Sequence, residues 1–369
     1  MQEAADRWEK RRLLPREVWG EKRDALRESI ELKYQMRLLF KALGKQDESV
    51  RGVCDDDAWV MQQFTEMLHV PRYALIKTCP LGYNDEDFDF HPLIYEEKVY
   101  SRCDSNSKVS SNIRVTNCND DSLITTLTGH TAYVCCLIMD DDKLYSGSQD
   151  YTIKIWNCST DTLIKTLTGH TSGVICLTIS DGKLYSGSGD HSIKVWNCSN
   201  HELITTLGAP EEHDEEGEYE GHTSSVYCLT INDGKLYSGS SDGTIKVWDC
   251  STNKLITTLT ENTDDVYRLR LHGGKLYSQA HNVVKVYDCS DDTLITTLED
   301  HTGWVKCLEI HDGKLYTGSD DKTINVYDCS DDSLITTLRG HTDRVMELTF
   351  QNGKLYSKQG DRDIYIWQL

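Results

Sequence analysis

The sequence predicts an all-β fold, a seven-bladed β-propeller, preceded by an α-helical extension in residues 1–70. Three observations lead to this prediction: one segment returns along the chain, its copies lie about 40 residues apart, and each repeat contains four short β-prone runs. The segment Lys143–Asp150 returns at Lys183–Asp190, Lys235–Asp242 and Lys314–Asp321. Repeats at a fixed period of this length indicate a repeat architecture rather than an ordinary globular domain.

An aromatic residue closes each repeat. Successive aromatic residues are 40, 52, 39, 40 and 40 positions apart, and they are Trp156, Trp196, Trp248, Tyr287, Tyr327 and Trp367. Four antiparallel strands in each repeat describe a propeller blade, because one such sheet buries its faces only against neighbouring copies. Pairs such as Asp181-Gly182 and Asp233-Gly234 are typical of tight two-residue hairpin turns.

The predicted propeller occupies residues 71–369. The sequence ends on the third strand of its last blade, so that blade needs a fourth strand from elsewhere. Residues 73–79 contain Leu-Ile-Lys-Thr, which matches the fourth strand of the second blade at Leu163–Thr166. We therefore expect residues 73–79 to pair with the C-terminal blade and close the ring, which removes open sheet edges that invite aggregation.

At these repeats the chain resembles the WD-repeat, or β-transducin-like, family. Four blades begin with Gly-His and a fifth with Asp-His, and each closes roughly thirty residues later on Trp or Tyr. The resemblance implies that His, Ser or Thr, Asp and the aromatic residue form a structural hydrogen-bond network in each blade, since a buried histidine needs partners for both nitrogens. The sets are His130, Ser146, Asp150, Trp156; His170, Ser186, Asp190, Trp196; His222, Ser238, Asp242, Trp248; His301, Thr317, Asp321, Tyr327; and His341, Ser357, Asp361, Trp367.

Two blades depart from this pattern. The first lacks the Gly-His pair, the turn Asp and the Trp, and the fifth has Asn262, His281 and Tyr287 at those positions. Such departures indicate either drift of the sequence or a place where another molecule docks.

The resemblance also places the Gly-His loops and the Asp turns on one face of the disc, around a central opening. Trp304 is the foremost candidate for partner binding there, because other blades have Tyr, Gly, Ser, Asp or Arg at its position and packing does not require Trp. Alternatively, its ring folds over its own loop. The partner-binding residues predicted on this face are Trp304, Arg344, Tyr133, Tyr151, His191, Lys322 and Arg362.

A twelve-residue insertion near residues 208–220 separates the third blade from the fourth and holds seven acidic residues. It contains almost nothing to bury, so we expect a loop on the same face. Two interpretations stay open: a solvated insertion, or a segment that a cation or a basic partner orders.

The N-terminal extension is predicted to contain a long helix at residues 16–44, flanked by Pro15 and Gly44, and a second helix at residues 55–68. Its apolar side either packs on another protein or on the flank of the propeller. The docking residues predicted there are Leu32, Met36, Leu39, Phe40, Leu43, Trp59 and Phe64.

The net charge of −21 lies almost wholly in the propeller, because residues 1–70 carry thirteen basic and fourteen acidic side chains. Nucleic-acid binding draws on cationic contacts, so direct binding of DNA or RNA by the propeller is not expected. Proteins, including those with basic surfaces, are the expected partners. No apolar run approaches the ~20 residues of a membrane helix, so no membrane insertion is expected.

The fourteen cysteines follow the repeats. None has a CxxC partner or a His at zinc-ligand spacing, so no metal and no cofactor is expected. They are interpreted as small buried residues in the cytoplasm or another reducing compartment, with import into an organelle left open. Two recurrent positions hold most of them: Cys118, Cys158, Cys198, Cys250, Cys289, Cys329; and Cys136, Cys176, Cys228, Cys307.

These features favour a non-enzymatic protein-interaction scaffold, a subunit of a larger multiprotein assembly. The alternative is a substrate-recognition adaptor of a ubiquitin ligase, since Leu14–Val18 looks like the opening of an F-box, although the charged run at residues 21–24 departs from that module. An enzyme is not expected, because the sequence shows no phosphate-binding Gly loop and no nucleophile outside the repeated sets.

Overall fold

The computed structural model describes residues 93–102, 111–208, 220–262, 264–351, 353–360 and 363–368. All of these residues belong to one compact unit. They form seven antiparallel sheets and contain no helix, which confirms the all-β fold and matches seven blades. The helices expected in residues 1–70, the closing strand expected at residues 73–79 and most of the acidic insertion lie outside the described residues.

Each sheet is an up-and-down meander whose strands follow one another in chain order, and we number the sheets one to seven. Sheet one contains β1 (Leu93–Tyr95), β2 (Lys98–Arg102), β3 (Ile113–Asn117) and β4 (Leu123–Leu127). Sheet two contains β5 (Val134–Asp140), β6 (Lys143–Ser148), β7 (Ile153–Asn157) and β8 (Thr162–Leu167). Sheet three contains β9 (Val174–Ser180), β10 (Lys183–Ser188), β11 (Ile193–Asn197) and β12 (Leu203–Leu207).

The remaining sheets repeat this order. Sheet four contains β13 (Val226–Asn232), β14 (Lys235–Ser240), β15 (Ile245–Asp249) and β16 (Leu255–Leu259). Sheet five contains β17 (Val266–His272), β18 (Lys275–Ala280), β19 (Val283–Asp288) and β20 (Leu294–Leu298). Sheet six contains β21 (Val305–His311), β22 (Lys314–Ser319), β23 (Thr323–Asp328) and β24 (Leu334–Arg339). Sheet seven has three described strands, β25 (Val345–Gln351), β26 (Lys354–Gln359) and β27 (Asp363–Gln368).

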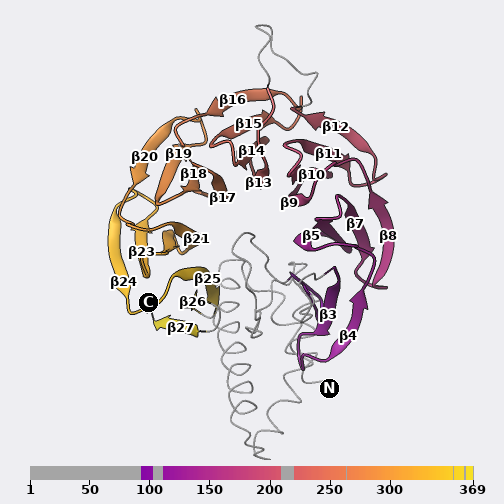
Figure 1. Ribbon diagram of the computed structural model, residues 1–369, viewed down its shortest axis with the longest axis horizontal. Coiled ribbons are helices and arrows are strands. Elements are labelled where there is room, and N and C mark those ends of the chain that lie inside the picture. Colours follow the sequence, from indigo (N-terminus) through magenta and orange to yellow (C-terminus); the bar gives the residue numbers. More distant parts are fainter. Residues whose placement is uncertain are drawn as a thin grey trace, which may run out of the picture. The chain divides into compact units, whose positions relative to one another are not determined.

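The sheets follow one another around a common centre. Figure 1 shows the first strands β5, β9, β13, β17, β21 and β25 on the inside and the fourth strands β8, β12, β16, β20 and β24 on the outside. The first strands of successive sheets contact each other from β5 to β25. The inner strands therefore form the wall around whatever lies at the centre.

The hydrophobic core lies between neighbouring sheets. Each of the six buried clusters draws its residues from two consecutive sheets, as where Tyr237 and Val247 of sheet four pack against Val266 and Leu276 of sheet five. A single large apolar side chain buried in this way contributes about 1.5–3 kcal/mol. Each sheet therefore depends on its neighbours for stability, as expected for repeats that cannot bury both faces alone.

The hairpin turns between first and second strands use the residues that the sequence indicated. Asp181 and Gly182 have φ of 50° and 69°, and Asp233 and Gly234 have φ of 46° and 76°. Two successive positive φ angles define the type I′ turn, whose twist matches that of paired strands. Glycine at the second position adopts this conformation without steric cost.

A second set of contacts joins consecutive sheets. Lys235 Nζ lies 2.8 Å from Asp292 Oδ2, and the Tyr237 hydroxyl donates to Asp292 Oδ1 at 2.9 Å. The same contacts link Lys98 and Tyr100 to Asp161, and Lys275 and Tyr277 to Asp332. We call this arrangement the Lys-Tyr-Asp link.

The links on either side of sheet three lack their aspartate. His201 and Asn253 stand where sheets two, five and six have Asp161, Asp292 and Asp332. The buried hydroxyls of Tyr145 and Tyr185 and the buried His201 Nδ1 and Asn253 Oδ1 make no hydrogen bond. A buried polar atom without a partner costs about 1–3 kcal/mol, so these two junctions are weaker than the others.

The eleven described cysteines are buried or half-buried, and none of them forms a disulfide. Three on the inner strands reach the next sheet, as where Cys228 Sγ lies 3.5 Å from the carbonyl oxygen of Val266. Burial raises the pKa of the Cys158 thiol to about 11. A thiol that stays protonated is a poor nucleophile and a poor metal ligand, so Cys158 has a packing role.

Candidate functional site

The repeated His, Ser, Asp and Trp residues come together as one hydrogen-bonded unit in each sheet. In sheet four, His222 Nδ1 lies 2.9 Å from Asp242 Oδ2, and His222 Nε2 lies 2.8 Å from Ser238 Oγ. The Trp248 indole donates to the same Ser238 Oγ at 2.9 Å. Because an ionised carboxylate only accepts, Nδ1 carries the proton and the serine hydroxyl donates to Nε2.

The same distances recur in sheets two, three and six. His130 and His170 make contacts of 2.8 Å to Asp150 and Ser146 and to Asp190 and Ser186, and His301 contacts Asp321 and Thr317 at 2.8 and 2.7 Å. In sheet seven, His341 and Trp367 meet at Ser357, while Asp361 lies outside the described residues.

The protonation states of Asp242 and His222 are consistent with this hydrogen-bond network. Burial raises the pKa of the Asp242 carboxyl, but hydrogen bonds from His222 and Thr244 outweigh burial and hold that pKa well below its usual value of about 4. Burial also lowers the pKa of His222, so the ring is neutral near pH 7. Ser238 is 0% exposed, and no substrate can reach its hydroxyl. The set contains the residue types of a Ser-His-Asp catalytic triad, but because its serine is buried its role is structural.

The residue that follows each turn aspartate is held with a positive φ angle. Tyr151, His191 and Lys322 have φ of about 70°, and Gly243 occupies the same position in sheet four with φ of 76°. All three side chains are exposed, and Lys322 Nζ donates to the Thr342 carbonyl at 2.9 Å. Three of the predicted face residues therefore point away from the core at equivalent places.

The other predicted face residues differ in exposure. Tyr133 is half-buried and packs against the cluster between sheets two and three. Arg344 is half-buried beside Asp343, whose carboxylate accepts its backbone N–H at 2.8 Å. Arg362 lies outside the described residues, as do all seven residues predicted for the helical extension: Leu32, Met36, Leu39, Phe40, Leu43, Trp59 and Phe64.

Trp304 is half-exposed and contacts the neighbouring sheet as well as its own. Its side chain is 43% exposed, and its ring lies 4.9 Å from the His281 ring between centroids, at an interplanar angle of 59°. Lys306 Nζ lies 4.8 Å from the Trp304 ring centroid. The ring is therefore held between an imidazole and an ammonium group while nearly half of it faces solvent, and a cation over indole is stabilising.

Sheet five is built differently from its neighbours at this place. The chain from Lys275 to Val284 in sheet five is one residue shorter than the equivalent chain from Lys235 to Ile245 in sheet four, so the turn between β18 and β19 is shortened. Asn262 replaces the histidine and bonds the Tyr287 hydroxyl at 3.3 Å and Ser278 Oγ at 3.4 Å. Two long hydrogen bonds thus replace the short network of the other sheets.

The inner wall of sheet five has also changed. Four sheets pair a cysteine on the first strand with a glycine on the second, as Cys228 pairs with Gly239. The glycine is required, because a Cβ at Gly239 would lie 2.6 Å from Cys228 Sγ and 2.6 Å from Val266 Cγ1. In sheet five the pair is Arg268 with Gln279. The Gln279 amide donates to the Val305 carbonyl of sheet six, where sheets three, four and six use the cysteine thiol for the equivalent contact.

Val305 is bound through both of its backbone polar groups by sheet five. Its N–H donates to the His281 carbonyl at 2.8 Å, and its carbonyl accepts from Gln279. Trp304 and Lys306 are its neighbours in the chain, so these two bonds fix where both side chains stand. The shortened turn supplies the His281 carbonyl, and Gln279, which stands in place of glycine, supplies the amide. Together they hold the strand that carries the exposed tryptophan.

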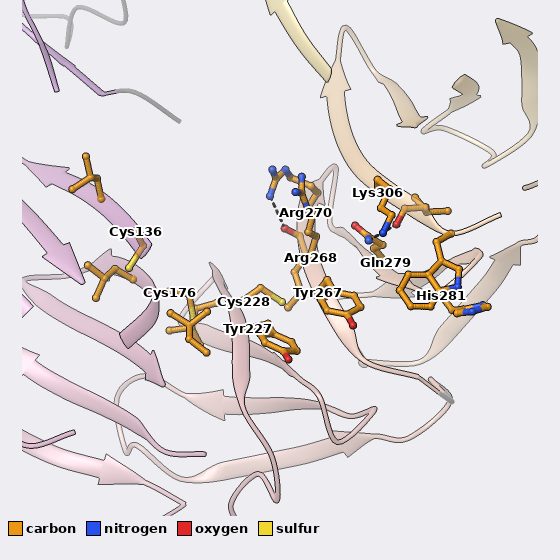
Figure 2. A pocket seen from close by; sticks show the side chains of 17 residues that line it. Cys136, Cys176, Tyr227, Cys228, Tyr267, Arg268, Arg270, Gln279, His281 and Lys306 are labelled. Carbon is orange, nitrogen blue, oxygen red and sulfur yellow. Dashed lines mark hydrogen bonds between the residues drawn. The ribbon is translucent and has the colours of Figure 1, made fainter. Parts of the chain in front are cut away.

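A cavity of about 210 Å³ opens beside this support (Figure 2), lined by inner-strand residues of sheets two to six. Figure 2 shows Arg268 and Arg270 together on β17, with Tyr227 and Tyr267 below them and Gln279, His281 and Lys306 on the far side. The two tyrosine rings stack at 5.1 Å between centroids. Of the described residues that line the cavity, three are Arg or Lys and none is Asp or Glu.

The repeats match a known family. The family model described as WD domain, G-beta repeat matches residues 121–157, 161–197, 214–249 and 292–328. These four segments contain the complete sets of sheets two, three, four and six. The chain is a WD-repeat protein. The resemblance inferred from the sequence is thereby confirmed.

One solved structure similar to this WD-repeat chain is the crystal structure of the computationally designed Ika8 protein, at 24% identity and a TM-score of 0.51. The match covers 77% of this chain and 98% of that chain, and it shows the fold alone.

Curated relatives match one repeat only. Proteins named probable E3 ubiquitin ligase complex SCF subunit sconB are 51% identical over 41 residues in Arthroderma benhamiae and 48% identical over 42 residues in Talaromyces marneffei. The counterpart in Aspergillus terreus is 46% identical over 41 residues. These matches cover 11% of this WD-repeat chain and span about 6% of the length of the relatives.

Two further findings concern the described residues alone. They hold no group of His, Cys, Asp and Glu side chains placed to bind a metal ion. They also hold no helix long and apolar enough to cross a membrane.

Sequence reasoning had noticed Asn262, His281, Tyr287 and Trp304 but not Arg268, Gln279 or the cavity. The signal was present, because Arg268 and Gln279 break two repeat positions that four other sheets fill with cysteine and glycine. What the sequence did not show is that these two positions face each other across β17 and β18.

Proposed function

We propose that this WD-repeat protein is a non-enzymatic interaction scaffold, a subunit of a larger assembly, that binds a protein partner at the face carrying Trp304. The observation that carries the proposal is the half-exposed indole of Trp304, which is bordered by a cavity and whose neighbour Val305 makes two hydrogen bonds to sheet five. A rigid aromatic side chain beside cationic residues is the usual composition of a binding hot spot. Tyr151, His191 and Lys322 extend the same proposed surface.

The test is capture of partners from native cells with the full chain and with Trp304→Ala. Loss of a central aromatic hot spot costs at least about 2 kcal/mol, so the captured partner should fall by more than tenfold. Ile256→Ala is the matched control, because Ile256 is 48% exposed on the outer strand β16. Capture that survives Trp304→Ala unchanged would overturn the proposal.

A second candidate function is a substrate-recognition adaptor of a ubiquitin ligase. It is supported by the matched relatives, which are named as probable subunits of an E3 ubiquitin ligase SCF complex, and by the F-box-like opening expected at Leu14–Val18. Deletion of residues 1–70 distinguishes the two. An adaptor loses ligase subunits but keeps its substrate at the Trp304 face, whereas a scaffold held by the extension loses its assembly without any ligase subunit among the lost proteins.

The proposal includes a reducing intracellular compartment, cytoplasmic or organellar. Eleven described cysteines without a disulfide support it, since oxidising compartments favour disulfides in cysteine-rich chains.

A further inference from the structure

We propose that β20 and β24, the fourth strands of sheets five and six, form a docking surface for an amphipathic helix of a partner protein, with lysine or arginine along both borders of its apolar side. This inference goes beyond the proposed function, because the surface lies on the outside of the ring and does not include Trp304. The residues of this surface, which we call the outer patch, are Leu294, Ile295, Leu334, Ile335, Asp291 and Asp331.

The first argument is where the exposed apolar side chains lie. Of the fourteen large apolar side chains that are exposed among the described residues, eleven belong to fourth strands, which lie on the outside of the ring in Figure 1. In the outer patch the exposed fractions are 37% for Leu294, 44% for Ile295, 41% for Leu334 and 48% for Ile335. Single exposed apolar side chains need no explanation, whereas apolar patches rimmed by polar residues are typical of protein interaction sites.

The second argument is the backbone that exposes these pairs. Consecutive side chains of a strand point to opposite faces, so a local irregularity is needed to expose both. The pairing of β19 with β20 passes from Leu294 to Thr296 and skips Ile295, which forms a β-bulge. The same bulge lies at Ile335, and it recurs in all six described fourth strands. A bulge re-aims side chains and interrupts pairing at a sheet edge, so these strands present side chains and are poor templates for an added strand.

This geometry selects the occupant. Pairing of the strand with its counterpart in a second copy needs an uninterrupted edge, which the bulge removes, and two chains of net charge −21 repel each other. A membrane surface is disfavoured as well, because carboxylates beside the patch repel anionic headgroups. A helix satisfies its own backbone groups and docks through side chains alone, so it makes no demand on the strand edge.

The charge beside the patch determines the borders of that helix. Asp291 and Asp331 are exposed, and each lies three residues before the first leucine of its strand. Each is held in its turn by a backbone N–H that donates to Oδ1, from Thr293 at 3.1 Å and from Ser333 at 3.0 Å. Hydrogen bonds from Ser333 lower the pKa of Asp331, so its carboxylate is charged at pH 7. From the first leucine to the last, neither strand contains a charged residue, so an apolar stripe bordered by cations complements the patch.

The fourth strands of sheets two and four provide a comparison inside the same chain. Ile164 and Ile256 are exposed to 42% and 48%, as much as the isoleucines of the outer patch. However, Lys165 follows the first of these residues directly, and Lys254 directly precedes the strand that holds the second. Threonine stands at the position of Asp291 in both sheets. A basic helix should therefore bind these two strands more weakly.

The experiment uses the full chain with ¹³C-labelled isoleucine δ-methyl groups, whose resonances are assigned by Ile295→Val, Ile335→Val and Ile256→Val. The first probe is a peptide of about 18 residues, or five helical turns, in which leucine forms one stripe and lysine fills the other positions. The second has glutamate in place of lysine, and the third is a scramble of the first without a stripe. We expect the leucine–lysine helix to shift the Ile295 and Ile335 resonances saturably and the Ile256 resonance little. The glutamate and scrambled peptides should produce no saturable shift.

The decisive variant is Ile295→Thr with Ile335→Thr. Threonine already follows each of these isoleucines and favours β-structure, so the variant keeps the strands while removing the apolar contact. Its affinity for the leucine–lysine helix should fall at least about tenfold. Ile256→Thr makes the same change on β16 and should leave the affinity unchanged.

The charge of the patch is tested by Asp291→Asn with Asp331→Asn. Asparagine keeps the Oδ1 acceptor of the turn, as Asn200 does in sheet three, where it accepts the Glu202 N–H at 3.1 Å. The affinity for the leucine–lysine helix should fall by about threefold or more at low salt, and its salt dependence should weaken.

Three results would overturn the inference: equal saturable shifts at Ile256 and Ile295, an equal effect of the scrambled or glutamate peptide, or undiminished affinity of the Ile295→Thr/Ile335→Thr variant. Trp304→Ala should leave binding of the helix unchanged, and a loss there would contradict a separate surface. If the native partner is lost with Trp304→Ala while the helix fails to bind the outer patch, the proposed function stands and this inference fails. Partner capture that survives Trp304→Ala, together with a bound helix, would mean the reverse.

Discussion

Sheets four and five are neighbours with the same order of strands, but beyond the shortened turn of sheet five they differ in two sets of side chains. Sheet four has the buried network of His222, Ser238, Asp242 and Trp248 and a cysteine–glycine pair on its inner wall. Sheet five has two longer hydrogen bonds, of 3.3 and 3.4 Å, around Asn262, and an arginine–glutamine pair on its inner wall.

The difference distinguishes residues that stabilise a sheet from residues that the sheet exposes to the cavity. In sheet four the four network residues hydrogen-bond one another inside the sheet, so they stabilise the fold and do not form a binding surface. Sheet five keeps the packing between sheets through Leu276 and Tyr287, both buried, but turns Arg268, Gln279 and His281 toward the cavity and Trp304. Three altered positions of sheet five meet at one place, and the binding function proposed above would account for this departure from the repeat.

The largest contrast concerns the buried networks. His222→Ala removes two short hydrogen bonds and leaves a cavity where the buried ring stood, which should cost about 3 kcal/mol of unfolding free energy, although Asp242 keeps its hydrogen bonds from Thr223 and Thr244. Asn262→Ala removes two hydrogen bonds of 3.3–3.4 Å and should cost about 1 kcal/mol. Urea unfolding of the two variants measures both costs. Equal losses would show that sheet five depends on its polar core as much as sheet four does.

The inner-wall pair provides the next contrast. Gly239→Gln alone should destabilise the protein by about 2 kcal/mol, because its Cβ meets Cys228 Sγ and Val266 Cγ1 at 2.6 Å. Combining it with Cys228→Arg should recover part of the loss, since arginine and glutamine coexist at these positions in sheet five. Thermal unfolding of both variants tests this, and the account is wrong if the double variant is less stable than the single one.

Acid should affect sheet four more than sheet five. The pKa of Asp242 is lowered in the folded state, so its contribution is complete above about pH 4 and is lost as pH falls through the folded value. The pKa of His222 is also lowered, so its contribution is complete above about pH 6.5 and declines on acidification. The variant His222→Asn/Asp242→Asn should lose less stability than wild type between pH 7 and pH 3. An unchanged pH slope would contradict this.

The smallest expected effect lies at the junctions of sheet three. Asn253→Asp supplies a carboxylate acceptor for the unpaired Tyr185 hydroxyl and an ion-pair partner for Lys183, which now donates only to the Cys250 carbonyl, as Asp292 does for Tyr237 and Lys235. The gain should be up to about 1 kcal/mol, because the ion pair stays partly solvated. Asp292→Asn is the reverse control and should destabilise the protein. A destabilised Asn253→Asp variant would mean that the two junctions are not equivalent.

Much of this fold could be predicted from the sequence, because local spacing dictated it. The turn residues Asp181 and Gly182 and the spacing of 20 residues between His130 and Asp150 follow from the repeat alone. The function of sheet five did not follow in the same way. Arg268 and Gln279 are eleven residues apart, and their significance depends on the register of β17 with β18 and on Val305 of the next sheet.

The net charge could be read from the sequence, but the local charge of the cavity lining could not. A net charge of −21 favoured basic partners, yet the lining of the cavity is cationic, because residues that are scattered in the chain meet only after the sheets pack. Trp304 could be singled out in advance, while its contact with His281 depends on how the turn of sheet five packs against sheet six.

The central claim, that the partner enters at the wall of sheet five, is tested most directly by a photo-crosslinking amino acid placed at Tyr267 in the full chain within native cells. The matched position is Ile256, which lies exposed on the outer strand of sheet four. The account predicts a covalent adduct with the partner at position 267 and little or none at position 256. A partner captured at position 256 and absent from position 267 would contradict it.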